Sequence, residues 1–190
     1  GDAFMFGIRS DGRLAKNVDP IVRFTPYIMP MRCDAQNFCK LSLEYDSIVS
    51  YIKERRAQGH SLSFMTIVIA AFVRTVSQCP ELNRFVANKR IYSRNRISVS
   101  FVVLKDTKTE EIGESLAKVE FDPDATIFEV EEKIERAIEN GRTNKEGTLT
   151  DKFANALLAV PFLPTLIVGL ARLLDRYGLL PGIVYDASPF

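Results

Sequence analysis

Few side chains in this 190-residue chain can act as a nucleophile or a base: it holds one histidine and three cysteines. His60 lies in the segment H-S-L-S-F, just before a long apolar stretch. Cys33 and Cys39 are candidate nucleophiles, but neither has a histidine near it in the sequence to accept the thiol proton. We therefore interpret His60 as an ordinary loop residue and both thiols as buried or half-buried structural groups.

The sequence shows no motif for binding a metal ion or a nucleotide. Cys33, Cys39 and Cys79 are an odd number and show no metal-ligand pattern. The sequence therefore predicts neither a zinc site nor a disulfide framework, and we assign no metal ligand. No glycine-rich phosphate loop follows an expected strand, which argues against nucleotide-dependent enzymes.

The composition is that of an ordinary globular protein. Hydrophobic residues make up 46% of the chain, enough for one domain with a sizeable core. The 25 Lys and Arg residues balance 24 Asp and Glu, without a basic block, which argues against a nucleic-acid partner. The first residues lack the charged-then-apolar order of a signal peptide. We expect a cytoplasmic protein with reduced thiols.

The elements that would position a site are organised around an apolar stretch in the middle of the chain. From Phe64 to Val76, apolar side chains cover nearly the whole helical circumference, which is typical of a buried helix. Ser61 or Ser63 can cap its start. Cys79-Pro80 ends it, because the residue before a proline is pushed out of the α region.

A hairpin and two longer strands are expected after this helix. Asn88-Lys89 is typical of a tight turn between two short strands. Residues 97–103 and 117–121 each alternate apolar with polar side chains, so both predict strands that bury one face.

The region before the central helix is expected to be less regular. Residues 1–22 have no sustained period and are interpreted as a loose N-terminal arm. The prolines within residues 24–31 limit that stretch to an edge strand or an extended lead-in. Residues 38–45 alternate in hydrophobicity and predict a half-buried strand. A helix follows and ends at Gly59.

Two helices are expected in the last third. Thr126 and Glu129 form a capping box for the first, which Asn140-Gly141 ends. Residues 153–171 carry no charge, so a membrane span has to be considered. Two prolines interrupt the stretch and it continues as an amphipathic helix. We therefore favour a helix over the sheet or in a subunit interface, and expect no membrane.

A resemblance to a known family rests on the central region. The helix ends in P-E-L-N at residues 80–83, a hairpin follows, and the next strand reads I-S-V-S-F-V-V. In this order the elements resemble the catalytic core of the 2-oxo acid dehydrogenase acyltransferases, whose fold chloramphenicol acetyltransferase shares. The match covers residues 24–150 and, more loosely, 151–190. It implies an α/β (α+β) two-layer sandwich: a mixed, mainly antiparallel sheet with helices on one face.

The resemblance also implies a chemistry. It is the transfer of an acyl group from a coenzyme A (CoA) thioester to a small-molecule hydroxyl or thiol acceptor, in a homotrimer. In the family, the base is the histidine of an H-x-x-x-D-G motif, and a Ser or Thr stabilises the oxyanion. This sequence lacks that motif, so we assign no catalytic residue.

Two interpretations of the domain at residues 23–190 follow. We expect it to lack the C-terminal catalytic part of the family domain and to supply scaffold and part of the substrate channel of an intact acyltransferase. The alternative is a non-catalytic oligomeric scaffold with the same fold.

Six residues are carried over as candidate substrate-binding side chains. Four precede residues 38–45 and match the segment that lines the acceptor pocket in the chloramphenicol enzyme. Two lie on the polar side of the strand that edges the active-site channel in the family. Edge packing and solvent-facing serines are the alternatives that the sequence leaves open. The six are Phe24, Tyr27, Met31, Cys33, Ser98 and Ser100.

Overall fold

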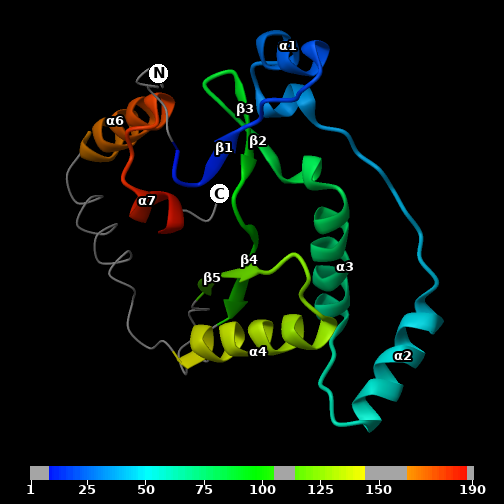
Figure 1. Cartoon of the computed structure of the whole chain (residues 1–190). Coiled ribbons are helices and arrows are strands. Elements are labelled where there is room, and N and C mark those ends of the chain that lie inside the picture. Colours follow the sequence, from blue (N-terminus) through cyan, green and yellow to red (C-terminus); the bar gives the residue numbers. More distant parts are fainter. Residues whose placement is uncertain (1–8, 105–113, 144–161, 188–190) are drawn as a thin grey trace.

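The computed structural model describes residues 9–104, 114–143 and 162–187, and in these ranges the chain is a mixed α/β protein (Figure 1). The described strands form two antiparallel sheets, one ordered β1-β3-β2 and one made of β4 and β5, where we had expected a single sheet. The predicted antiparallel pairing is confirmed. The strands are β1 (Gly12–Leu14), β2 (Arg84–Ala87), β3 (Arg90–Arg94), β4 (Ile97–Leu104) and β5 (Glu114–Phe121).

Helices account for most of the remaining described structure. Two short 3-10 turns, η1 and η2, follow the first and third helices, at Arg32–Ala35 and Pro80–Asn83. The helices are α1 (Pro20–Ile28), α2 (Tyr45–Ala57), α3 (Phe64–Gln78), α4 (Ile127–Thr143), α6 (Leu163–Tyr177) and α7 (Gly182–Ala187).

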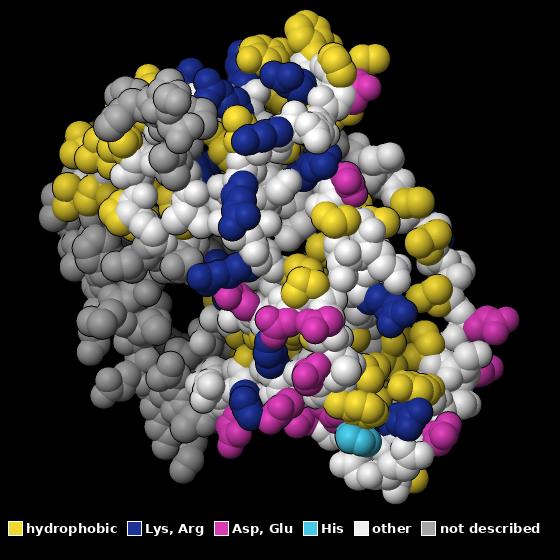
Figure 2. Space-filling model, in the orientation of Figure 1, with side chains coloured by type: hydrophobic (Ala, Val, Ile, Leu, Met, Phe, Trp, Pro, Cys, Tyr) yellow, Lys and Arg dark blue, Asp and Glu magenta, His cyan; other side chains and the backbone are white. Residues whose placement is uncertain are grey.

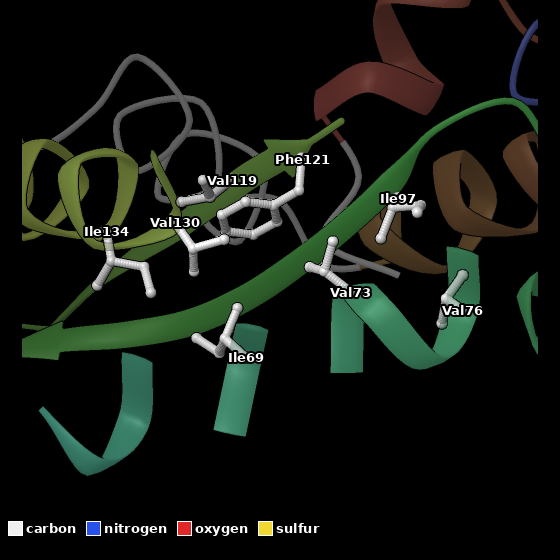
Figure 3. Close-up of a cluster of buried hydrophobic side chains, with 8 residues drawn as sticks. All are labelled: Ile69, Val73, Val76, Ile97, Val119, Phe121, Val130 and Ile134. Atoms are coloured by element: carbon white, nitrogen blue, oxygen red, sulfur yellow. The ribbon is translucent and has the colours of Figure 1, made fainter. Parts of the chain in front are cut away.

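The main hydrophobic core lies between the β4–β5 hairpin and helices α3 and α4 (Figure 3). The predicted alternation of both strands is confirmed, since Val119 and Phe121 of β5 are buried and pair across from Val99 and Ile97 of β4. Burial of these branched and aromatic side chains holds the two helices against the hairpin. The core residues are Ile69, Val73, Val76, Ile97, Val119, Phe121, Val130 and Ile134.

Helix α4 begins at the predicted capping box. The Glu129 carboxylate accepts hydrogen bonds from the backbone N–H and the hydroxyl of Thr126, at 2.7 and 2.9 Å. These bonds lower the pKa of Glu129, because they stabilise its charged form. The helix continues past the predicted end at Asn140-Gly141 to Thr143.

Helix α3 is buried on one face only, so the prediction of a helix buried all round is wrong. Its start is as predicted, because the Ser63 hydroxyl caps the N–H of Thr66 at 3.1 Å. The side chains of Phe64, Val68 and Phe72 remain 47–48% exposed on the side turned away from the core. Helix α3 therefore has two apolar faces, and the described residues cover only one of them.

Residues 20–28 form helix α1, so the predicted edge strand over residues 24–31 is wrong. The Asp19 carboxylate accepts a hydrogen bond of 2.8 Å from the N–H of Ile21, which caps the helix. Pro20 occupies the first turn, where the missing N–H costs nothing. Pro26 lies near the end of the helix, after these signals have already started it.

The predicted strand over residues 38–45 is also absent from the described structure. Figure 1 shows an extended segment between η1 and α2 that runs outside α3. Its apolar side chains face solvent, with Phe38 88% and Leu41 81% exposed. A strand needs a partner for its backbone groups, and none of the described strands pairs with this segment. Helix α2 follows and ends before Gly59, as predicted.

The N-terminal arm is tied to the fold more firmly than we expected for residues 1–22. Strand β1 pairs with β3. The side chain of Arg9 is only 7% exposed, and its guanidinium donates to Asp11 at 2.9 Å and to Asp175 of α6 at 2.7 Å. It also lies 4.5 Å from the ring centroid of Tyr185 in α7. This one cation therefore joins the arm to both C-terminal helices.

Helix α6 contains the described end of the charge-free stretch 153–171; residues 144–161 lie outside the described part. Gly178 ends the helix with a φ of 68°, a backbone conformation that glycine adopts without strain. Within the described ranges, no helix has the length and apolar character needed to cross a bilayer.

Candidate functional site

A cleft of about 730 Å³ lies between helix α1 and the β2–β3 hairpin. Helix α1 contributes one wall, the hairpin tip a second, and the end of β1 with the residues after it the rest of the lining. Two of the six predicted site residues, Phe24 and Tyr27, are on the α1 wall. The cleft is lined by Leu14, Ala15, Lys16, Pro20, Arg23, Phe24, Tyr27, Lys89, Arg90 and Ile91.

The lining carries four positive charges and no negative one. Lys16 follows β1, Arg23 lies on α1, and Lys89 and Arg90 come from the hairpin tip. Figure 2 shows Lys and Arg side chains gathered over this upper part of the molecule, whereas Asp and Glu gather lower down, over α4. Four like charges around one open cleft favour an anionic ligand. Arg in addition offers paired donors to a phosphate group.

The hairpin turn gives the cleft its second wall. Asn88 and Lys89 have φ values of 47° and 60°, the left-handed conformations of a two-residue turn between antiparallel strands. Because a lysine side chain is present where such turns favour glycine, the turn places a cation over the cleft. The Lys89 ammonium lies 5.0 Å from the ring centroid of Tyr27.

The α1 wall is aromatic. Phe24 and Tyr27 lie one turn apart, and their rings stack with centroids 6.0 Å apart and an interplanar angle of 20°. Both residues are more than half exposed, although Lys89 lies over the Tyr27 ring. Exposed ring faces beside cations suit a ligand that combines a flat aromatic base with phosphate.

A second cleft of about 350 Å³ lies on the other side of the hairpin tip, against α6. Arg90 lines both clefts. The other cations of the second cleft are Arg176, which donates a 3.3 Å bond to the amide oxygen of Asn88, and Arg9. Its acidic group, Asp175, is already paired with Arg9.

Met31 and Cys33 lie outside the first cleft, although both were predicted to line the same pocket as Phe24 and Tyr27. Helix α1 ends before them and the chain turns away through η1, where the N–H of Met31 bonds to Asp34 at 3.1 Å. Both side chains are exposed. The prediction assumed an extended segment, in which all four residues would follow one line.

Ser98 and Ser100 lie on β4, in the other sheet, and do not line either cleft. They share the face of β4 that points away from the core, opposite Glu120 and Lys118 of β5. Ser98 is half-buried and Ser100 exposed. The structure therefore separates the two serines from the aromatic pair with which they were grouped.

His60 lies in the loop before α3, as predicted, and has a structural environment. Its Nδ1 faces the buried carboxylate of Glu131 at 3.5 Å, and its ring stacks on Phe128 with centroids 4.2 Å apart. Both partners belong to α4. The imidazole therefore ties the α2–α3 loop to α4.

The cysteines correct a further prediction. We expected buried or half-buried thiols at Cys33 and Cys39, but both are exposed, as is Cys79. Among the described residues, no group of histidine, cysteine or acidic side chains is arranged to hold a metal ion.

The described structure is thus a mixed α/β protein with a cationic cleft that has one aromatic wall. No protein-family model matches the chain, and searches of curated proteins and of solved structures find no significant match.

The cations of the site were not predicted from the sequence. A signal was present, because residues 84–96 contain five Lys and Arg residues and no acid. The overall charge balance concealed it, since the acidic residues concentrate elsewhere, with 13 of the 24 in residues 106–146.

Proposed function

We propose that this chain belongs to a CoA-dependent acyltransferase and supplies its CoA-binding part. The observation that carries the proposal is the cleft between α1 and the hairpin, with four cations and two exposed rings. CoA has a matching end, an adenine base on a ribose that carries a 3′-phosphate and a 5′-diphosphate. The rings of Phe24 and Tyr27 are placed to contact the base, and the cations to pair with the phosphates.

The reaction is the transfer implied by the family resemblance. A hydroxyl or thiol of a small acceptor attacks the thioester carbonyl, the carbon–sulfur bond breaks, and the CoA sulfur leaves as a thiolate that takes up the acceptor proton. The described residues of this chain are not assigned as the base for that step. Their role is to hold CoA, which fixes the position of the thioester.

Calorimetric titration with CoA tests this proposal. We expect binding by the wild type and a loss of about fivefold to tenfold in affinity for Arg23→Gln, since a charge-assisted phosphate contact contributes about 1–1.5 kcal/mol. Arg136→Gln on α4 is the matched control, because it removes the same charge from an exposed arginine outside both clefts. Absence of CoA binding, or equal losses in the two variants, would overturn the proposal.

A non-catalytic oligomeric scaffold is the second candidate, and one feature of α6 favours it. The outer face of α6 carries an apolar row at spacings of four, three and four residues, as in helices that pack along one another. These side chains are 46–69% exposed. The row consists of Leu166, Leu170, Leu173 and Tyr177.

The oligomeric state separates the two candidates. The family resemblance implies a homotrimer, and both candidates allow one. If Leu170→Arg dissociates the oligomer in sedimentation while the wild type binds no CoA, the scaffold is the function. If the wild type binds CoA, the acyltransferase proposal stands, whatever the effect of Leu170→Arg.

A further inference from the structure

The two clefts that flank the hairpin tip share a side chain. Arg90 lines the larger cleft together with Lys16 and Arg23, and it lines the smaller one together with Arg176. A cation common to both means that an anion in one cleft lies close to an anion in the other. The hairpin tip is therefore a positively charged ridge between two binding spaces.

The smaller cleft keeps a net positive charge once its internal pairing is counted. Arg9 is committed to Asp11 and to Asp175, and the hydroxyl of Tyr185 also donates to Asp175 at 3.1 Å. These contacts satisfy the acid that lines the cleft. Arg90 and Arg176 then remain as the cations of its lining that have no acidic partner within the lining.

We infer that the two clefts form one site for a nucleotide with phosphate groups at two positions, one group on each side of the hairpin tip. This inference rests on the proposed function and deepens it. The diphosphate belongs in the larger cleft, which offers more volume and the additional cations Lys16 and Arg23. The single 3′-phosphate belongs in the smaller cleft, between Arg90 and Arg176.

Different residues contact the phosphate groups at the two positions. A ligand without the 3′-phosphate keeps its contacts in the larger cleft and gives up those in the smaller one. Arg176 should therefore matter only for ligands that carry the 3′-phosphate, whereas Arg23 should matter for every ligand with the diphosphate. The comparison is a double-mutant cycle in which one change is made in the protein and the other is the removal of the 3′-phosphate from the ligand.

The test is a calorimetric titration of the wild type, Arg176→Gln and Arg23→Gln with CoA and with dephospho-CoA, which lacks the 3′-phosphate. We expect the wild type to bind dephospho-CoA about fivefold to tenfold more weakly than CoA. Arg176→Gln should lose that preference and bind dephospho-CoA as the wild type does. Arg23→Gln should weaken both ligands and keep the preference.

The Arg176 side chain also bonds to Asn88, so a second variant separates charge from turn structure. Arg176→Lys keeps the charge and should retain most of the preference for CoA. Equal losses for both ligands in Arg176→Gln, or no preference in the wild type, would overturn the two-position site. Because CoA would still bind in either case, those outcomes leave the proposed function standing, whereas binding of neither ligand removes both.

Discussion

The ammonium of Lys89 lies 5.0 Å from the ring centroid of Tyr27. The contact joins the hairpin tip to α1, two elements far apart in the sequence that both line the larger cleft. A cation over an exposed ring contributes only about 0.5–1 kcal/mol. A phosphate group can therefore draw Lys89 away from the ring at small cost, which makes this contact suited to a site that opens for its ligand.

Lys89→Gly should raise stability and lower CoA affinity. The residue has a φ of 60°, which glycine adopts freely, so relief of this strain should raise the free energy of unfolding by about 0.5–1 kcal/mol after loss of the ring contact. The cleft loses one cation, and CoA should bind several-fold more weakly. Urea unfolding and calorimetry measure the two effects. Lys53→Gln on α2 is the control, and a parallel change in stability and affinity would contradict the interpretation.

Two glycines in helices should respond in opposite ways to substitution by alanine. A Cβ at Gly141 would lie 3.0 Å from the Cβ of Val103 in β4, whereas a Cβ at Gly169 would meet nothing within 4 Å. Gly169→Ala should therefore gain about 0.5–1 kcal/mol from helix propensity. Gly141→Ala should instead lose about 1 kcal/mol, because overpacking exceeds that gain. Chemical denaturation of both variants checks the difference, and equal gains would show that α4 does not pack this closely on β4.

Removal of the His60 imidazole should destabilise the fold without affecting CoA. His60→Ala leaves the buried Glu131 carboxylate without the ring nitrogen that faces it at 3.5 Å, and a loss of about 1–3 kcal/mol follows. Adding Glu131→Gln to His60→Ala should recover part of that loss, because a neutral amide costs less to leave buried without a partner than a carboxylate does. Urea unfolding of the single and double variants measures the coupling. Independent, additive losses, or a change in CoA affinity, would contradict a purely structural role.

Stability should fall at high pH through Tyr185. Burial raises the pKa of its phenol from 10.0 to about 12, and the hydrogen bond to Asp175 acts in the same direction. The folded state thus favours the protonated phenol. This contribution is complete below pH 10 and is lost as the pH rises through 12. Urea unfolding between pH 9 and 12 should show a steeper decline for the wild type than for Tyr185→Phe. Parallel curves would place Tyr185 in a solvent-like environment.

Most of the fold around α3, α4 and the hairpins follows from local signals that the sequence states directly. The Ser63 cap, the Asn88-Lys89 turn, the alternation of β4 and β5 and the capping box at Thr126 each depend on a few neighbouring residues. Such signals are satisfied within one element, and they were predicted with the correct element type.

Two errors arose where a pattern depended on a distant partner or on competing signals. Residues 38–45 alternate like a strand, but no described strand pairs with them. In α1, the prolines were interpreted as excluding a helix, whereas the Asp19 cap and Pro20 start one. That change of element moved Met31 and Cys33 out of the cleft and left Phe24 and Tyr27 within it.

The cationic part of the site was not predicted, because its cations come from three segments. Lys16 and Arg23 are each unremarkable in the sequence, Arg90 lies in the cation-rich run at residues 84–96, and the pairing of β1 with β3 brings the segments of Lys16 and Arg90 to one place. The net charge of the whole sequence does not reveal a cluster of cations that come from separate segments. The net charge also hides the acidic surface of α4.

The most direct test of the central claim is a backbone amide NMR titration of the chain with CoA. We predict saturable shift changes in α1, in the residues after β1 and at the hairpin tip, with Arg23, Lys89 and Arg90 among the largest. The amides of Ser98, Ser100 and His60 should stay in place. Changes centred on β4, or no changes at millimolar CoA, would contradict the assignment of this cleft as the CoA site.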